Sequence, residues 1–344
     1  MTKVAHFVSF GIGGADRAAL ELIRALTKKL PEIQICFGEM SFPIRTSDQD
    51  PSQELLNTFQ EFKTLGIMRE IQDVKELSKL DIDILHTHRS GEDEWLIPGL
   101  SKVERDFKIV ETNFHGFLMT PADFRIYPSC ALPDFRKIKL NKDSQVIPNI
   151  VNTFKGTSLR TKLGISEGTI VFGRVGRSDR SIYSPKLLRH FSKIQNSNTL
   201  LLWIGKSEQA MKDAESFGVK NIIWVDPVSD PVEMANYYAT FDVFCHANPL
   251  GETFGNTVAE AVIRGLPVAS IKGNRKYPQA QKELLDRTQY SSRSSDFSQT
   301  LKNYRDSSSL RRTVSARNVL FSEQHLEPEA IASKVMQVYE RVLL

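Results

Sequence analysis

Two glutamates, Glu252 and Glu260, flank a glycine-containing loop within residues 246–269, and this stretch has the clearest chemical content of the chain. A short apolar run typical of a strand precedes the loop, and apolar residues at helical spacing follow it until Gly265 ends the pattern. The N–H groups at the start of such a helix and the helix dipole favour a bound phosphate group. The stretch therefore predicts a strand, an anion-binding loop and a helix, with a diphosphate as the ligand. The loop and helix-start residues expected around this ligand are Phe254, Gly255, Asn256 and Thr257.

The glutamates need a role other than anion binding, because carboxylates repel phosphate. Helical side chains lean toward the N-terminus of their helix, so Glu260 can reach a group bound just outside the helix end. An ionised carboxylate accepts hydrogen bonds, and a ribose offers a pair of hydroxyl donors. The alternative is a capping box, in which Thr257 caps the helix and Glu260 returns to its backbone N–H. That alternative gives no role to Glu252 or to the loop.

This stretch resembles the donor-site signature of retaining GT-B glycosyltransferases of the group 1 type. The family motif is Glu-x-Phe-Gly, then Glu-Ala, then Gly-x-Pro-Val. Here it reads Glu252, Phe254-Gly255, Glu260-Ala261 and Gly265-Leu266-Pro267-Val268. The resemblance implies that Glu252 faces the transferred sugar and that Glu260 holds the ribose of the nucleotide.

The chain begins with a second unit of strand, glycine turn and helix. Residues 4–10 have the apolar content of a strand, and apolar residues recur at helical spacing as far as Leu26. The glycines between them fit tight strand–helix packing as well as they fit ligand binding. The run from Gly13 is similar to the first loop and helix of the same family. This implies that Gly13 and Gly14 let the backbone approach the donor phosphate and the acceptor.

Two histidines stand at the end of a buried strand predicted over residues 82–88. Ligands of open α/β sheets bind at the carboxyl ends of the strands, which is where His86 and His88 lie. The pair also suggests a metal site, but no third ligand is spaced nearby, so we expect these side chains to line a cleft. Residues 52–80, before this strand, are expected to be helical.

A further strand, over residues 108–114, feeds a polar loop that contains His115 and Gly116. This arrangement resembles the family's strand that ends in a His-Gly pair beside the transferred sugar. It makes His115 the better functional histidine. The alternative is a loop histidine that is satisfied by local hydrogen bonds.

Residues 146–154 are the candidate hinge, because Pro148 and Asn149 break the pattern before a new series of strands and helices. The segment resembles the Ile-Pro-Asn-Gly-Val-Asp crossover between the two domains of the family. Ile150 stands where the family has glycine, and Asn152 where it often has aspartate.

Residues 170–186 are predicted to form the first strand and loop of the second half, and they contain the pair Gly176-Arg177. In the family an arginine in this place and a lysine a few residues later neutralise the donor diphosphate. The usual lysine position falls near Ile182 here, so the resemblance leaves Arg180 or Lys186 to supply the second charge. The alternative for Arg177 is an exposed surface arginine.

Composition excludes several classes of protein. A chain of 344 residues exceeds the size of a single core, and 40% hydrophobic with 25% charged residues is typical of a soluble globular enzyme. The net charge of +4 is too small to indicate nucleic-acid binding. Three isolated cysteines predict neither a disulfide framework nor a cysteine-rich metal site. With no membrane-length apolar run and no signal-like N-terminus, a cytoplasmic protein without a membrane span is expected, and peripheral membrane contact stays open.

Together these patterns predict an α/β protein with two Rossmann-like domains that face each other across a cleft, the GT-B architecture. The expected parts are residues 1–148 as an N-terminal domain on the acceptor side, 149–326 as a C-terminal domain on the nucleotide-sugar side, and 327–344 as a C-terminal helix that crosses back to the first domain.

The resemblance implies a retaining glycosyltransferase that moves a sugar from a nucleotide-diphosphate donor to a hydroxyl of a glycan, lipid or small molecule, with no cofactor. No metal is expected, because Arg177, Arg180 and Lys186 lie beside a predicted helix N-terminus and the stretches assigned to the cleft contain no Asp-x-Asp motif. One alternative is a GT-B-shaped sugar-nucleotide epimerase. The other, motivated by the absent lysine, is a non-catalytic glycosyltransferase-like partner subunit. A dinucleotide dehydrogenase is disfavoured, because neither half carries a full Gly-x-Gly-x-x-Gly turn.

Overall fold

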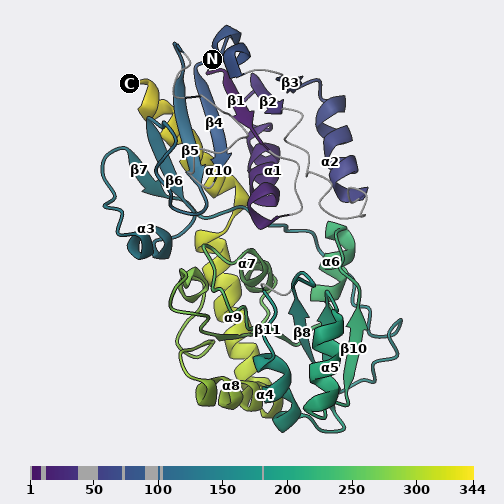
Figure 1. The fold of residues 1–344 in the computed structure, drawn as a ribbon. Helices are drawn as coiled ribbons and strands as arrows, with labels where there is room; N and C mark the ends of the chain where they lie inside the picture. The colour runs from purple at the N-terminus through teal and green to yellow at the C-terminus, as the bar shows by residue number, and fades with distance from the viewer. Residues whose placement is uncertain are drawn as a thin grey trace. The chain divides into compact units, whose positions relative to one another are not determined.

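The computed structural model divides the chain into two compact units, and each is described by itself (Figure 1). Unit 1 comprises Met1–Val151 and His325–Leu344, and unit 2 comprises Asn152–Gln324. The structure describes residues 2–8, 13–37, 53–71, 74–89, 100, 104–179 and 182–344.

Unit 1 is built on a seven-stranded parallel sheet in the order β3-β2-β1-β4-β5-β6-β7. The strands are β1 (Val4–Phe7), β2 (Ile33–Phe37), β3 (Met68–Glu70), β4 (Ile84–Arg89), β5 (Lys108–Asn113), β6 (Phe124–Tyr127) and β7 (Ser144–Val146). The helices are α1 (Gly14–Leu26), α2 (Gln53–Thr64), the 3-10 helix η2 (Val74–Lys79), α3 (Ala131–Arg136) and α10 (Pro328–Leu343).

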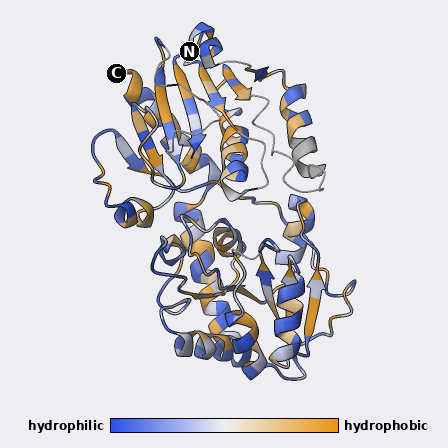
Figure 2. Cartoon of the chain, in the orientation of Figure 1, coloured by the Kyte–Doolittle hydropathy of each residue, from blue (hydrophilic) through white to orange (hydrophobic). Residues whose placement is uncertain are grey.

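The core of unit 1 follows from the apolar periodicity of its elements. Strand β1 is buried along its whole length, and the apolar stripe of α1 packs on the sheet beside that of α10 (Figure 2). From α10, Val335 and Val338 lie in this core although they are far from α1 in sequence. The expected helix over residues 52–80 is wrong in one part, because β3 interrupts it. This short strand pairs with β2, and tertiary pairing overrides its weak local signal.

Unit 2 is built on a six-stranded parallel sheet in the order β10-β9-β8-β11-β12-β13. The strands are β8 (Ile170–Val175), β9 (Thr199–Ile204), β10 (Ile222–Val225), β11 (Val243–His246), β12 (Val268–Ile271) and β13 (Tyr290–Ser291). The helices are α4 (Lys186–Ile194), α5 (Glu208–Ser216), α6 (Pro231–Tyr238), α7 (Asn256–Ile263), the 3-10 helix η4 (Ala280–Glu283), α8 (Ser294–Asp306) and α9 (Ser308–His325).

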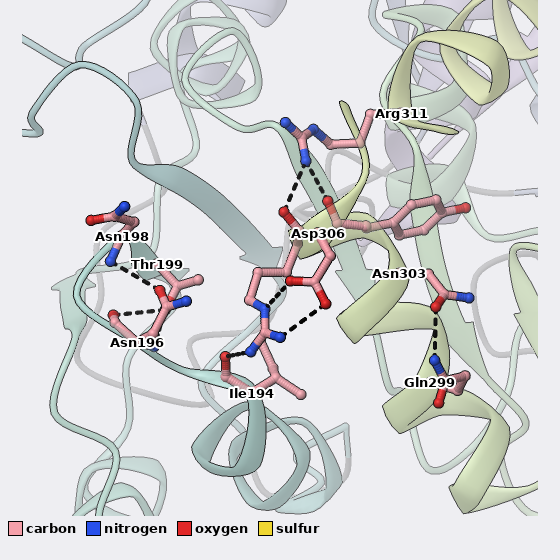
Figure 3. A network of polar contacts seen from close by, with 10 residues as sticks. Ile194, Asn196, Asn198, Thr199, Gln299, Asn303, Asp306 and Arg311 are labelled. Carbon is pink, nitrogen blue, oxygen red and sulfur yellow. Dashed lines mark hydrogen bonds and ion pairs between the residues drawn. The ribbon is translucent and has the colours of Figure 1, made fainter. Parts of the chain in front are cut away.

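The core of unit 2 joins α4, α5 and α8 to the sheet, with Trp203 almost fully buried. Polar contacts secure the end of α8 (Figure 3). Arg305 donates to the carbonyl oxygen of Ile194 at the end of α4, and Arg311 donates to the carbonyl oxygens of Tyr304 and Arg305. These contacts satisfy carbonyl groups that a helix end leaves unpaired.

Both units therefore have the Rossmann-like form that the sequence predicts, in which helices connect parallel strands. Within the described parts of the chain, no helix has both the length and the apolar content needed to span a membrane.

Candidate active site

In unit 2 the order of the sheet reverses between β8 and β11, which are paired neighbours. In open α/β sheets ligands bind at the carboxyl ends of the strands at such a switch point. The loop that follows β8 contains Gly176 and Arg177, and the loop that follows β11 contains Glu252 and Gly255. Topology therefore brings the sequence-predicted residues of unit 2 to one edge of the sheet.

The loop after β11 turns into α7 at Gly255, whose φ of +100° favours glycine. Helix α7 begins at Asn256, so the N–H groups of its first turn lie at the ligand-binding edge. Phe254 is buried beneath the loop. The capping-box alternative is wrong about the helix start, because the N-cap is Gly255 and not Thr257.

Glu260 lies in the first turns of α7 and is half-buried. Its Oε2 accepts a hydrogen bond of 2.8 Å from the hydroxyl of Tyr238, at the end of α6. Arg264 covers the Tyr238 ring at 4.9 Å from its centroid and donates to the backbone oxygen of Glu260 at 2.8 Å. The carboxylate is thus oriented by a neighbouring helix.

Glu252 is held on its side chain and on its backbone. Its Oε1 lies 2.9 Å from both His246 Nε2 and Asn248 Nδ2, and its backbone N–H donates to the oxygen of Pro278. His246 Nδ1 lies 3.1 Å from the Ser270 hydroxyl. We assign the ring proton to Nε2, because an ionised carboxylate only accepts hydrogen bonds. The Glu252 side chain keeps 23% exposure, so it is fixed and still reachable by a ligand.

The cations of the β8 loop differ in their surroundings. Arg177 is 59% exposed in its side chain and forms an ion pair of 3.1 Å with Asp179. Lys186 is exposed at the first residue of α4. Arg180 lies outside the described residues. Arg174, which precedes the loop, is buried and was given no role in the sequence analysis.

In unit 1 the glycine turn leads into α1 with Gly13 as the N-cap and Gly14 as the first helical residue. Gly13 has an extended backbone that any residue could adopt, and its carbonyl accepts from the N–H of Arg17. A Cβ at Gly13 would lie 3.0 Å from Asp16 Oδ2, the end of a flexible side chain that can move aside. Residues 9–12 lie outside the described residues.

His115 is exposed in the loop after β5, and Asn113 shapes that loop. Asn113 Oδ1 accepts from the N–H groups of His115 and Gly116 at 3.3 and 2.6 Å, while its amide donates to the carbonyl of Phe117. Arg136 donates to the backbone oxygen of His115 at 2.9 Å. Gly116 has a φ of +76°, which explains the glycine of the His-Gly pair.

His86 and His88 have a third histidine beside them, which the sequence analysis did not find. His6 of β1 is the register partner of His86 in β4, so the three rings share one face of the sheet. One ring nitrogen from each lies within 4.8 Å of those of the others. The objection that no third metal ligand lies nearby was therefore wrong, because strand pairing brings together residues that are far apart in sequence.

Hydrogen bonds within unit 1 hold most of the ring nitrogens of this histidine cluster. His6 Nδ1 lies 2.9 Å from His88 Nε2, and His86 lies 2.6 Å from the Tyr339 hydroxyl and 2.8 Å from that of Thr112. Burial lowers the pKa of all three imidazoles, that of His88 to about 3, so the rings are neutral at pH 7. His88 also lines a small cavity of unit 1, with Thr112, Phe114, Asn149 and neighbouring apolar side chains.

Residues 169–285 match the family described as Glycosyl transferases group 1. This segment runs from β8 through α7 to η4, so it contains Arg177, Glu252 and Glu260. About a third of the chain, within unit 2, is thus similar to group 1 glycosyl transferases. No curated protein sequence matches the chain.

The fold of this chain is that of known GT-B structures. It is similar to HepE of Anabaena, solved with UDP and glucose, at a TM-score of 0.76 and 13% identity over 99% of this chain and 100% of that one. It is also similar to sucrose-phosphate synthase of Thermosynechococcus elongatus, at 0.75 and 16% over 99% of each chain. WaaG, a glycosyltransferase of lipopolysaccharide biosynthesis, aligns at 0.60 and 13% over 98% of this chain and 99% of that one.

Sequence reasoning missed the residues that hold the two glutamates. His246 and Asn248 lie in the quoted stretch, and their spacing of six and four residues from Glu252 was an available signal. Tyr238 is 22 residues from Glu260, on another helix, so no local pattern indicates their contact.

Proposed function

We propose that this enzyme transfers a glycosyl group from a nucleotide-diphosphate sugar to a hydroxyl acceptor with retention at the anomeric carbon. The observation that carries the proposal is the pair of fixed glutamates, Glu252 and Glu260, on either side of the N-terminus of α7. The HepE structures contain UDP or UDP-glucose, which supports a nucleoside diphosphate as a ligand of this fold. UDP is accordingly the first nucleotide to test.

In this scheme the leaving diphosphate is stabilised by Arg177 and by the first-turn amides of α7, and Glu260 accepts from the ribose hydroxyls. Preorganised donors aimed at developing negative charge are usually the largest single contribution to catalysis. Lys186 or Arg180 supplies the second cation. The bound diphosphate would therefore be neutralised without a divalent metal, which normally reaches phosphates through carboxylates.

Glu252 and His115 are proposed to contact the transferred sugar. Glu252 supports this role by its fixed yet reachable carboxylate, and His115 by its exposure on a loop shaped by Asn113. Alanine at either position should reduce turnover far more than nucleotide affinity. Equal losses of both quantities would indicate a structural role instead.

The deciding experiment measures nucleotide binding and sugar transfer on the same preparation. Among UDP, GDP and ADP, the cognate diphosphate at about 100 times its Kd should stabilise the folded protein by about 2.7 kcal/mol. Hydrolysis or transfer of the matching nucleotide sugar, with the product's anomeric configuration read by NMR, then tests the reaction. Interconversion of nucleotide sugars would indicate the epimerase, and binding without turnover of any donor would indicate the non-catalytic subunit.

A separate measurement tests the metal-free scheme. Transfer activity should persist in EDTA, because arginine and backbone amides carry the neutralising charge in this scheme. Activity that EDTA abolishes and manganese restores would refute it, without bearing on the assignment of Arg177.

A further inference from the structure

The guanidinium of Arg174 is buried near the carboxyl end of β8 without an ion pair to any carboxylate of the described residues. It lies over the ring of Trp203, 4.6 Å from the centroid. Burial lowers the pKa of Arg174 to about 10, against smaller raising influences of Tyr183 and Asp179, so the group is a cation at neutral pH. Buried charges in proteins are normally paired, because the loss of hydration costs several kcal/mol per ion.

Backbone carbonyl groups occupy the donors of this guanidinium. Nη1 donates to Gly176, Ile204 and Gly205 at 3.0, 2.9 and 3.3 Å, and Nη2 to Arg177 at 3.4 Å. Carbonyl dipoles compensate a cation in part, and they supply no opposite charge. The positive charge of Arg174 is therefore balanced only in part, by these carbonyl groups and by the Coulombic influence of Asp179, which is not ion-paired with it.

Two glycines show how closely the backbone is drawn around this side chain. A Cβ at Gly176 would lie 2.6 Å from Arg174 Nη2. A Cβ at Gly205, where φ is +82°, would lie 1.8 Å from the Gly176 oxygen. The loop after β8 and the end of β9 are thus built against the guanidinium.

The direction of the carbonyls fixes the direction of the following N–H groups. All described peptide bonds are trans, so each N–H points opposite to the preceding carbonyl. The oxygens of Gly176 and Arg177 point toward Arg174, so the N–H groups of Arg177 and Ser178 point away from it. Neither N–H donates to a backbone acceptor of the described residues. Successive N–H groups that point the same way form an anion-binding concavity.

We propose that Arg174 is a positioning residue for an anionic diphosphate, acting from behind the loop of Arg177 and Ser178. It turns their amides toward the ligand and adds a buried positive charge. This inference rests on the proposed function, since it requires the donor nucleotide to bind at the β8–β11 edge. It also gives the site a cation that comes from inside the fold, in addition to Arg177 and to the second cation from Lys186 or Arg180.

The test compares the affinities of nucleoside monophosphate and diphosphate, by calorimetric titration of the full chain. The base is the one among UDP, GDP and ADP that stabilises the wild type most. Arg174→Met should reduce the preference for the diphosphate roughly 10- to 150-fold, the range of a hydrogen bond to a charged group. Arg174→Lys keeps the charge with a single donor nitrogen, so it should reduce the preference by a smaller factor. If Arg174→Met does not fold, the diphosphate preference of Arg174→Lys alone tests the proposal.

Arg311→Met is the matched control. Arg311 also donates to two backbone carbonyls, at the end of α8 (Figure 3), and has no contact with the β8 loop among those observed. Its substitution should lower the melting temperature and leave the diphosphate preference unchanged.

The outcomes separate the two proposals. A preference within about twofold of the wild type in every folded Arg174 variant would overturn this inference and leave the donor site standing. Equal weakening of both nucleotides would reduce Arg174 to a structural role and also overturn it. A wild type that binds none of the three diphosphates would refute the donor site, and this inference with it.

Discussion

The two sheets share the order of their first six strands, while that of unit 1 has a seventh, and they differ in the charge of their switch points. In unit 1 the central strands β1 and β4 carry His6 and His88, and in unit 2 the central strands β8 and β11 carry Arg174 and His246. Burial makes the histidines of unit 1 neutral at pH 7, whereas the arginine of unit 2 stays cationic. An imidazolium loses its proton at neutral pH when it is desolvated, whereas a guanidinium keeps its proton and its charge at that pH. The identity of two or three buried residues thus decides whether the switch-point edge of the sheet is neutral or positively charged.

The largest expected effect is a loss of stability at acidic pH in unit 1 that unit 2 does not share. The histidine pKa values are lower in the folded state than the unfolded value near 6.5, so the unfolded state binds more protons as the pH falls below that value. Three such groups should remove about 4 kcal/mol from the free energy of unfolding between pH 7.5 and 5.5. Hydrogen exchange of the β1 and β4 amides at both pH values measures this.

His88→Gln provides the check, because it should remove about a third of that pH dependence. The amides of β8 and β9 serve as the internal reference for acid effects outside the cluster. An unchanged pH dependence in the variant would show that the three histidines are not the acid-sensitive groups.

Next in size is the loss of the exposed cation of unit 2. Arg177→Ala should lower kcat by about 10²–10³-fold, as for other preorganised charge stabilisers. Arg293→Ala is the comparison, since Arg293 is also exposed and paired with an aspartate two to three residues on. Full activity of Arg177→Ala in a steady-state transfer assay would refute the arginine assignment.

A smaller effect concerns the ribose. Glu260→Gln should weaken nucleotide binding by about 1.5–3 kcal/mol, the scale of a hydrogen bond to a charged group. The measurement is a calorimetric titration with the cognate diphosphate. Unchanged affinity combined with a lower melting temperature would mean that Glu260 serves only its contact with Tyr238.

The smallest expected effect shows whether the histidines of unit 1 serve stability or ligand binding. Tyr339→Phe removes the hydroxyl that contacts His86 Nδ1, which should lower the free energy of unfolding by about 1–3 kcal/mol, the penalty for an unsatisfied buried group. Nucleotide affinity should not change, because the described contacts of Tyr339 are all within unit 1. Urea unfolding and nucleotide titration together distinguish a loss of stability from a loss of binding.

Local patterns predicted most strands and the β11–α7 loop, because periodicity and a glycine requirement are written in consecutive residues. The strand expected over residues 82–88 is observed as β4 (Ile84–Arg89), and the loop residue Gly255 has the positive φ that only glycine adopts readily. The contacts that the sequence did not reveal join distant segments. His6 meets His88 through strand register, and Tyr238 meets Glu260 through helix packing.

Arg174 and Arg177, which are three residues apart, also show that a sequence pattern does not reveal burial. Both follow a glycine in the sequence, and the resemblance selects only Arg177. Burial distinguishes them, because Arg174 is enclosed by the carbonyls at the end of β9 while Arg177 reaches solvent. A one-dimensional pattern does not contain that difference.

The contact of Tyr339 with His86 spans 253 residues and has a consequence for the order of events at the ribosome. Unit 2 is one continuous segment, so it can close its sheet as soon as it has emerged from the exit tunnel. Unit 1 begins the chain and still waits for α10, the segment that supplies Tyr339 and part of its core. Of the two units, the one whose synthesis starts first is therefore completed last, and until then its nascent sheet has an uncovered apolar face.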